Sequence, residues 1–220
     1  MTKSTNSHSR PDQTRDRLIQ AGLEIFAEHG FNAATTRMLS SPAGVNLAAI
    51  PYHFGGKEGL YQAVVRHIAQ VALSRLEKAD VHIEQLLQND HAVDMELLEA
   101  LEGLYLALAR FLVGSGEADL FGPIIIREQM RPTAAFAILY ESMIESQARY
   151  AAQLIGRLLH KDADDPEIIL RTHALFGQVL AFRAARATVL RRMGWQTISE
   201  DQVEQICQAI SRNVRAVLTL

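Results

Sequence analysis

Apolar residues recur every three or four positions along almost the whole 220-residue chain, which is the spacing of one face of an amphipathic helix. No segment shows the strict apolar and polar alternation of a strand bounded by turn residues. A first helix is predicted over residues 13–29, where Leu18, Ile25 and Phe26 share one face and Gly30 provides a left-handed cap. The pattern therefore predicts an all-α protein.

Two short helices around a tight turn follow this first helix. Thr35 can cap the second helix through its hydroxyl and Asn46 can cap the third, with Ala43-Gly44-Val45 as the turn between them. Gly55-Gly56 ends the third helix before a fourth begins near Lys57. This arrangement is typical of a helix-turn-helix, whose second helix is presented to DNA.

Two prolines affect these short helices. Pro42 falls in the last turn of the second helix, and a proline inside a helix costs on the order of 3 kcal/mol. We expect that helix to be kinked or to end early. Pro51 removes an amide within the third helix, so we expect this helix to be short or distorted.

The rest of the chain predicts a larger helical domain. Its helices are expected at residues 57–88, 95–113, 119–130, 133–160, 166–193 and 199–220, separated by glycines, prolines and one acidic run. Residues 1–12 are polar enough to form a flexible arm. The expected domains are this arm, a helix-turn-helix domain at 13–60 and a helical domain at 61–220.

Composition and charge narrow the class of protein. Apolar residues make up 48% of the chain, with no run long enough to cross a bilayer and no apolar signal at the N-terminus, so a cytoplasmic protein is expected, without a membrane partner. The net charge is −3, yet residues 1–60 hold six Lys or Arg against five Asp or Glu, whereas residues 61–220 hold 16 against 20. The positive balance lies where the helix-turn-helix is expected.

Enzyme chemistry lacks the residues that it needs. No Glu is followed by His three residues later, as a di-iron bundle requires, and the eight histidines include no His-Glu-x-x-His zinc motif. Gly114-x-Gly116 has neither the strand nor the third glycine of a dinucleotide loop. The single cysteine, Cys207, is a packed thiol or, alternatively, an intersubunit bridge or redox sensor. We expect no enzyme activity, metal or cofactor.

Polar residues at two predicted helix starts suit DNA phosphates. Thr35, Thr36 and Arg37 lie at the start of the second helix, where free backbone amides and the positive end of the helix dipole favour an anion. Lys57 lies in the same situation at the start of the fourth helix. Such contacts position a protein on DNA and give salt-dependent affinity.

Residues 13–62 resemble the DNA-binding domain of TetR-family transcriptional regulators. The resemblance is carried by Leu18-x-x-Ala21 to Ile25-Phe26, Gly30-Phe31, Ala34-Thr35-Thr36, Ala43-Gly44-Val45-Asn46, Tyr52-His53-Phe54 and Gly56-Lys57-Glu58-x-Leu60-Tyr61. Segments 48–55 and 127–136 resemble the CecR-like branch of that family. The resemblance implies a three-helix domain that binds double-stranded DNA and a larger domain that binds a small effector and forms a homodimer.

By this resemblance the third helix is the recognition helix. Asn46 is its cap, and the side chains expected to face DNA are Leu47, Ala48, Ala49, Pro51, Tyr52 and His53. Tyr52 and His53 would reach phosphates, and the apolar side chains would contact thymine methyl groups or read DNA shape. The alternative is that Tyr52 and His53 only pack the small domain, as we expect of Phe54.

Two C-terminal helices suit a dimer interface. One carries a face on which small residues let another helix approach closely, formed by Leu170, Ala174, Gly177 and Ala181. The other carries an apolar stripe, formed by Val203, Ile206, Cys207, Ile210, Val214 and Val217. Packing within one chain is the alternative. TetR-like proteins dimerise in this region, and two-fold symmetry would set two recognition helices ~34 Å apart.

The apolar faces of the middle helices are candidates for the effector pocket that the resemblance implies. The candidate residues are Leu104, Tyr105, Leu108, Phe111, Phe121, Ile125, Gln129, Phe136, Tyr140, Met143, His173 and Phe176. Tyr105, Gln129 and His173 could orient a ligand. The same faces suit an ordinary core, which is the alternative for each residue. Their composition indicates a small, largely apolar effector.

The sequence thus predicts a sequence-specific transcriptional regulator, a repressor that an effector releases from a palindromic operator. The alternative is a helical protein-interaction module that does not bind DNA. Salt-sensitive and sequence-specific DNA binding would separate the two.

Overall fold

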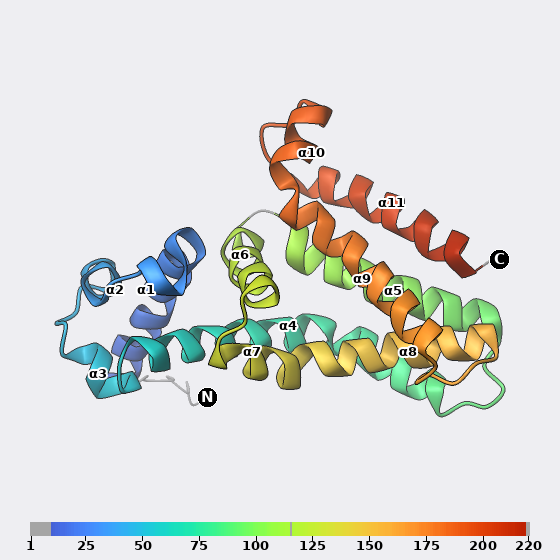
Figure 1. The fold of residues 1–220 in the computed structure, drawn as a ribbon, viewed down its shortest axis with the longest axis horizontal. Coiled ribbons are helices and arrows are strands. Elements are labelled where there is room, and N and C mark those ends of the chain that lie inside the picture. Colours follow the sequence, from blue (N-terminus) through green and yellow to red (C-terminus); the bar gives the residue numbers. More distant parts are fainter. Residues whose placement is uncertain (1–9, 115, 219–220) are drawn as a thin grey trace, which may run out of the picture.

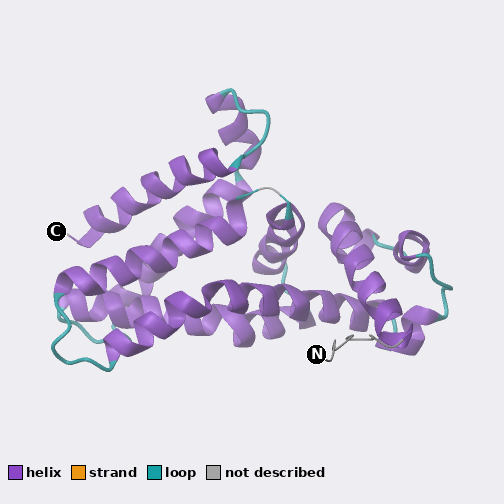
Figure 2. Ribbon diagram, turned by 180° about the vertical axis from the view of Figure 1, so that it is seen from behind, coloured by secondary structure: helices purple, strands orange, loops and turns teal. Residues whose placement is uncertain are grey.

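The computed structural model describes the backbone of residues 10–114 and 116–218 and the side chains of residues 12–114 and 116–216. These residues form helices and no strand, so the predicted all-α class is confirmed (Figure 2). Of the predicted arm, residues 1–9 lie outside the described part, and residues 10–12 already belong to the first helix.

The first three helices form a small domain at one end of the molecule (Figure 1). They are α1 (Arg10–Ala33), α2 (Thr36–Ala43) and α3 (Ala49–Phe54). Their shared core contains the fully buried side chains of Leu18, Phe26, Leu39 and Ile50. Because α2 and α3 have only eight and six residues, they are too short to be stable alone and depend on this core.

The regular part of α1 ends where the sequence predicts. Gly30 has a φ of 74° and a ψ of 172°, so the helix is interrupted after His29 and a single turn follows. A positive φ favours glycine, which has no Cβ to clash with the backbone. The chain then enters α2, where the Thr35 hydroxyl accepts a hydrogen bond from the Met38 amide at 3.2 Å. The predicted cap is confirmed.

The two prolines interrupt the short helices less than expected. α2 continues through Pro42 and ends at Ala43, where Gly44 with a φ of 62° caps it. Pro51 lies in the first turn of α3, where a backbone amide has no acceptor inside the helix, so the missing donor costs little. The expectation of a short α3 is confirmed.

α4 (Lys57–Leu87) joins the small domain to the rest of the protein. It runs from the end of α3 to the far end of the larger domain (Figure 1). Residues along its whole length are fully buried, among them Leu60, Val64, Ile68, Leu76 and Ile83. The boundary expected after residue 60 therefore falls inside one continuous helix.

The larger domain is a bundle in which α5 is central. Its further elements are α5 (Asp94–Val113), α6 (Glu117–Met130), α7 (Ala134–Leu139), the π-helical turn η1 (Tyr140–Ile144), α8 (Glu145–Leu159), α9 (Pro166–Ala184), α10 (Arg186–Met193) and α11 (Glu200–Leu218). α5 packs against α4, α8, α9 and α11. α6 stands between this bundle and the small domain (Figure 1).

The helix predicted over residues 166–193 is two helices in the structure. They separate at Ala185, which has a φ of −98° and a ψ of 24°, although no proline or glycine stands there. On either side of the break an arginine reaches the same carboxylate, since Asp119 Oδ1 lies 2.9 Å from Arg183 Nη1 and 3.6 Å from Arg186 Nη2. These contacts with α6 favour the bend, and no local signal predicts them.

The apolar face of α11 lies inside the chain and not on its surface. The residues assigned from sequence to a dimer interface on this helix are less than a tenth exposed in the single chain, namely Val203, Ile206, Cys207, Ile210 and Val214. They belong to the core that α11 shares with α5. Because no surface of theirs is left for a second subunit, that assignment was wrong and the alternative of intrachain packing holds. The side chain of Val217 lies outside the described residues.

Cys207 takes part in this packing. Its side chain is 1% exposed, and burial raises the pKa of its thiol. A thiol that is both buried and protonated reacts slowly. The structure therefore supports the packed-thiol interpretation and gives an intersubunit bridge no accessible sulfur.

Candidate DNA interface and ligand cavity

α3 and the turn before it carry an exposed apolar face. Leu47 is 44% exposed and Tyr52 is 82% exposed, whereas Ile50 on the opposite side is fully buried. Ala48 and Pro51 are exposed as well. Ile50 anchors this helix in the core, with Ala49 and Phe54 partly buried against it, whereas the outward residues Leu47 and Tyr52 remain available to a partner.

The geometry of this segment fits the predicted recognition helix. Asn46 Oδ1 accepts a hydrogen bond from the Ala48 amide at 3.0 Å in the turn before α3, but the N-cap of α3 is Ala48, which makes no side-chain cap bond, so the prediction that Asn46 caps the third helix was wrong. The rings of Tyr52 and His53 meet edge to face with 4.9 Å between their centroids. Ala49 and His53 are half-buried. The alternative that Tyr52 only packs the small domain does not hold, because this side chain is almost entirely in solvent.

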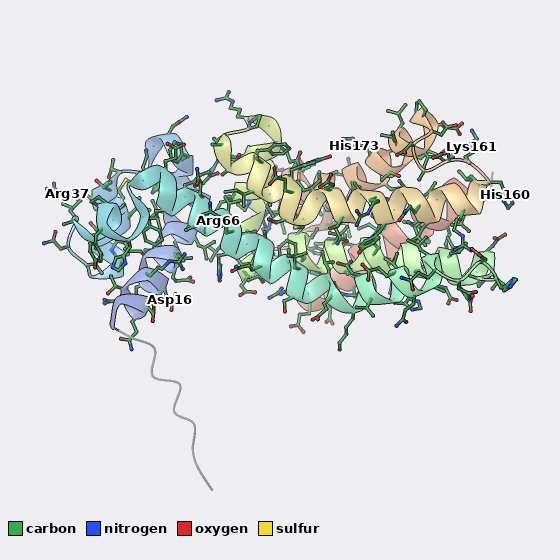
Figure 3. All side chains as sticks on the ribbon, turned by 90° about the horizontal axis from the view of Figure 1, so that it is seen from below. Asp16, Arg37, Arg66, His160, Lys161 and His173 are labelled. Atoms are coloured by element: carbon green, nitrogen blue, oxygen red, sulfur yellow. The ribbon has the colours of Figure 1, made fainter. Side chains whose placement is uncertain are left out.

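The start of α2 lies at the tip of the small domain. Thr35, Thr36 and Arg37 are all exposed there. Figure 3 shows Arg37 at this tip, in the half of the molecule opposite His173. The free amides of the helix start and an exposed guanidinium therefore point to one surface, as a phosphate contact requires.

Lys57 is used differently from what the sequence predicts. Its Nζ donates hydrogen bonds to the carbonyl oxygens of Phe31 and Ala34, both at 2.9 Å, and lies 4.6 Å from the centre of the Phe31 ring. Two of the three ammonium donors thus hold the junction between α1 and α2. The predicted phosphate contact is left with one donor and the backbone amides at the start of α4.

Two arginines of α1 that were not predicted as site residues lie beside the helix-turn-helix. The Arg15 guanidinium lies 5.5 Å from the centre of the Phe54 ring at the end of α3. Arg17 lies next to Gly44 in the turn between α2 and α3. Both side chains are exposed. In the sequence, the slight excess of Lys and Arg over Asp and Glu in residues 1–60 was the only indication of these two arginines.

The larger domain contains a cavity of about 770 Å³. It is enclosed by α5, α6, η1, α8, the loop after α8, and α9. Seven of the residues predicted for a pocket line it, namely Leu108, Ile125, Gln129, Tyr140, Met143, His173 and Phe176. A π-helical turn such as η1 often marks a functional site, and here it contributes Tyr140, Met143 and Ile144.

Five predicted pocket residues do not line the cavity. Leu104, Tyr105, Phe111 and Phe121 are at most 1% exposed and belong to the packed core. Tyr105 is a structural residue, because its hydroxyl donates to the Thr172 carbonyl at 3.3 Å and its ring packs on Phe176. Phe136 pairs with the Tyr140 ring instead. The core alternative is therefore correct for Leu104, Tyr105, Phe111 and Phe121, whereas the half-buried Phe136 belongs neither to the cavity lining nor to the core.

One wall of the cavity was missed from sequence. It consists of α8, the following loop and part of α9, and includes Gln147, Arg149, Gln153, Asp164 and Thr172. These residues are polar, so a search for apolar faces passed over them. Gln147 Nε2 donates to both carboxylate oxygens of Asp80, at 3.1 and 3.0 Å. Burial raises the pKa of Asp80, and this hydrogen bond opposes the shift.

α6 connects the cavity with the small domain. Its residues Ile125 and Gln129 line the cavity. Its residue Arg127 donates from Nη1 to the Phe26 carbonyl at 2.6 Å and from Nη2 to the Glu28 carbonyl at 3.2 Å, both on α1. A shift of α6 caused from the cavity would therefore act directly on the last turns of α1.

Glu128 forms a second link from α6 to the small domain. It is 1% exposed and accepts hydrogen bonds from the Tyr61 hydroxyl of α4 at 2.7 Å and from the Thr133 amide at 2.9 Å. Burial, followed by the bond to Glu128, raises the pKa of Tyr61 far above its usual value, so this hydroxyl stays a donor. The Tyr61 ring in turn packs edge to face on Phe26.

Metal binding and membrane insertion are two further possibilities for the described part of the chain. No group of three or more His, Cys, Asp or Glu side chains there is arranged to hold a metal ion. None of its helices is long and apolar enough to cross a membrane.

Two families match the chain in consecutive regions. Residues 18–64 match the bacterial regulatory proteins of the tetR family. Residues 97–219 match the C-terminal domain of the HTH-type transcriptional dual regulator CecR. The first region contains the helix-turn-helix and the second contains most of the cavity wall.

Relatives agree with both matches. The HTH-type transcriptional dual regulator CecR of Shigella flexneri is 36% identical over 211 residues, which cover 94% of this chain and 92% of that protein. The HTH-type transcriptional repressor AcnR of Corynebacterium glutamicum is 36% identical over 66 residues, 30% of this chain and 35% of that protein. The fold resembles a transcriptional regulator from Rhodococcus sp. Rha1, with a TM-score of 0.60 over 94% of this chain and 96% of that one, at 18% identity.

Proposed function

We propose that this chain, which belongs to the TetR family of bacterial regulatory proteins and is a DNA-binding transcriptional regulator, acts as a homodimeric repressor that a small effector releases from a palindromic operator. The observation that carries the proposal is the exposed apolar face of α3, with Tyr52 82% in solvent. A protein of this kind would work in the cytoplasm, where the chromosome is.

The contacts with DNA divide into two kinds. Thr35, Thr36, Arg37 and the amides at the helix starts would bind phosphates, together with Tyr52 and His53, and position the small domain. The base edges would be met by Leu47, Ala48, Ala49 and Pro51. Their apolar side chains would contact thymine methyl groups and would form few hydrogen bonds with the polar atoms of the base edges. Arg15 and Arg17 lie near enough to the helix-turn-helix to add phosphate contacts.

The dimer would form through α9. Leu170 is 70% exposed, and Ala174, Gly177 and Ala181 follow it on the same exposed face. A Cβ added at Gly177 would meet no atom of the chain within 4 Å, so the surface there is open to another helix. Two-fold symmetry through this face would give two recognition helices, and a palindromic operator would mirror that symmetry.

Release from DNA would pass through α6. An effector in the cavity would press on Ile125 and Gln129, and α6 would transmit the shift through Arg127 to the end of α1. An effector changes the affinity for DNA only if it binds one arrangement of α6 better than the other. The cavity and the operator site are then coupled by one short helix.

The first experiment is selection of bound duplexes from a random pool, followed by fluorescence anisotropy on the selected sequence at two salt concentrations. We expect a palindromic sequence whose affinity falls as salt rises. Absence of any enriched sequence would favour the interaction module instead.

The same operator tests the transmission through α6. Compounds that raise the thermal midpoint of the protein are added to the operator complex of the wild type and of Arg127→Met. We expect release from the wild type and weaker release from the variant at equal effector occupancy. Arg131→Met, an exposed arginine one turn further along, is the control. Equal release from all three proteins would contradict the proposed route.

A further inference from the structure

We infer that the cavity selects effectors that carry a hydrogen-bond donor, an N–H or O–H group, on an apolar body, and that the donor binds Gln147 Oε1 and the Thr172 hydroxyl. This inference rests on the proposed function, because it assumes that the cavity holds the effector.

Buried polar side chains single out two atoms at the cavity. Apart from tyrosines and Cys207, the described residues include four polar or charged residues that are at most 5% exposed, namely Ser40, Glu128, Gln147 and Thr172. Ser40 and Glu128 lie away from the cavity and have hydrogen-bond partners. Gln147 Oε1 and Thr172 Oγ1 have none, and both residues line the cavity. Buried polar atoms almost always have a partner, so these two atoms indicate the place of a ligand group.

The orientation of Gln147 decides which kind of group fits. Its Nε2 donates to Asp80 on α4, and only an amide nitrogen can donate to a carboxylate. The amide oxygen is therefore the atom left for the cavity, and it is an acceptor. A donor bond to a carboxylate also polarises the amide and strengthens its oxygen as an acceptor.

The unpaired Thr172 hydroxyl and the charges around the cavity are consistent with a ligand that carries a hydrogen-bond donor. The Thr172 carbonyl already accepts from Tyr105, so its hydroxyl is the group that remains unpaired. The charged side chains that line the cavity, Glu145, Arg149 and Asp164, are exposed and stay in water at its rim. With no cation buried beside Gln147 and the Asp80 carboxylate behind it, the interior disfavours an anion.

The remaining lining describes the body of the ligand. It consists mainly of Leu108, Leu112, Met143, Ile144, Phe176 and Val179. A volume of about 770 Å³ lies in the ordinary range of ligand pockets. A ring system with one phenolic or amine group fits this combination better than a wholly apolar molecule does, because the latter would leave both polar atoms unpaired.

The test compares two probes that differ in one donor, 2-naphthol and 2-methoxynaphthalene, by equilibrium dialysis against the full chain. The methoxy compound has more apolar area, so tighter binding of the naphthol can be attributed to its O–H donor. We expect the naphthol to bind roughly tenfold more tightly. Thr172→Val and Gln147→Met should each reduce the preference to about threefold or less. Gln153→Met, which removes an amide elsewhere on the same wall, should leave it unchanged.

Three results would overturn the inference. These are binding of neither probe, equal or tighter binding of the methoxy compound, and a preference that survives in both variants. If Gln147→Met does not fold, Thr172→Val carries the test alone, since valine has nearly the shape of threonine. Operator anisotropy on the same samples judges the proposed function separately, because a probe that binds with donor preference but releases no operator supports this inference and contradicts the release mechanism.

Discussion

α3 and α11 both place apolar side chains at helical spacing, and both were predicted to meet a partner, yet the structure treats them in opposite ways. The outward face of α3 is in solvent, with Tyr52 82% exposed. The apolar face of α11 is packed against α5, with Ile210 fully buried. Helical periodicity therefore predicts that a helix is amphipathic and does not predict whether its apolar face meets another chain or its own core.

The difference follows from how many apolar residues each helix has to spare. α3 is anchored by Ile50, with Ala49 and Phe54 partly buried beside it, and its outward residue Tyr52 contributes nothing to the core of the small domain. α11 is a 19-residue helix on the outside of the bundle, and its one stripe is fully consumed in attaching it. An excess of apolar residues over the core's need is a better indication of a partner surface than the stripe itself.

The sharpest test of this difference compares truncation of a buried apolar residue of α11 with truncation of an exposed apolar residue of α9. Ile210→Ala should lower the free energy of unfolding by about 2–5 kcal/mol, because a fully buried side chain leaves a cavity. Leu170→Ala, at a 70% exposed position on α9, should change the folding of the single chain by less than about 0.5 kcal/mol. Urea unfolding at two protein concentrations measures both and separates dimer effects. Equal midpoints for the two variants would contradict the assignment of α11 to the core.

The next largest effect concerns the dimer. Leu170→Glu places a charge on the proposed α9 interface, so we expect monomers and a loss of operator affinity of roughly a hundredfold, since each half-site would then bind alone. Sedimentation velocity and anisotropy measure the two effects. Val93→Glu, at another exposed apolar position, is the matched control. A Leu170→Glu protein that stays dimeric would move the interface away from this face.

A smaller difference is expected between two cations of the small domain, Lys57 and Arg37, when each is replaced by alanine. Lys57→Ala should cost about 1–3 kcal/mol of stability, because it removes two charged hydrogen bonds to the carbonyls of Phe31 and Ala34. Arg37→Ala should leave the unfolding midpoint unchanged and lower the slope of log affinity against log salt by about 1. Thermal unfolding and a salt titration distinguish the two roles. Should Lys57→Ala alter only the salt slope, its carbonyl bonds would be unimportant.

The smallest effect is expected on the recognition helix itself. Tyr52→Ala should weaken operator binding by roughly fivefold to tenfold through the loss of one contact. Because Tyr52 is almost entirely exposed, the unfolding midpoint should not change. Tyr52→Phe separates the hydroxyl from the ring. A destabilised Tyr52→Ala protein would show that α3 has no spare apolar residue after all.

The small domain could be predicted closely because its signals are local. Thr35 caps α2, and Gly30 and Gly44 end regular helix at positive φ, and each of these signals lies within a few residues of the helix it controls. The contacts of Lys57 could not be predicted from local signals. The sequence placed it at a helix start, but only the fold shows that the carbonyls of Phe31 lie within its reach.

The cavity was only half predictable for the same reason. Apolar faces pointed to Leu108, Ile125 and Phe176, yet equally to Phe111 and Phe121, which the structure buries in the core. Nothing in the sequence singled out Gln147, and its buried amide bonds to Asp80, which lies 67 residues earlier in the chain. The break at Ala185 likewise depends on tertiary contacts of its neighbours with α6.

The continuity of α4 has a mechanical consequence. Its 31 residues form a rod of about 46 Å, with the small domain at one end and the helical bundle packed around the other. A tilt of the rod by about 5° would carry the tip about 4 Å, slightly more than the ~3.4 Å step between base pairs. If the proposed dimer forms as a symmetric pair, the displacements of its two tips would add to about two base-pair steps.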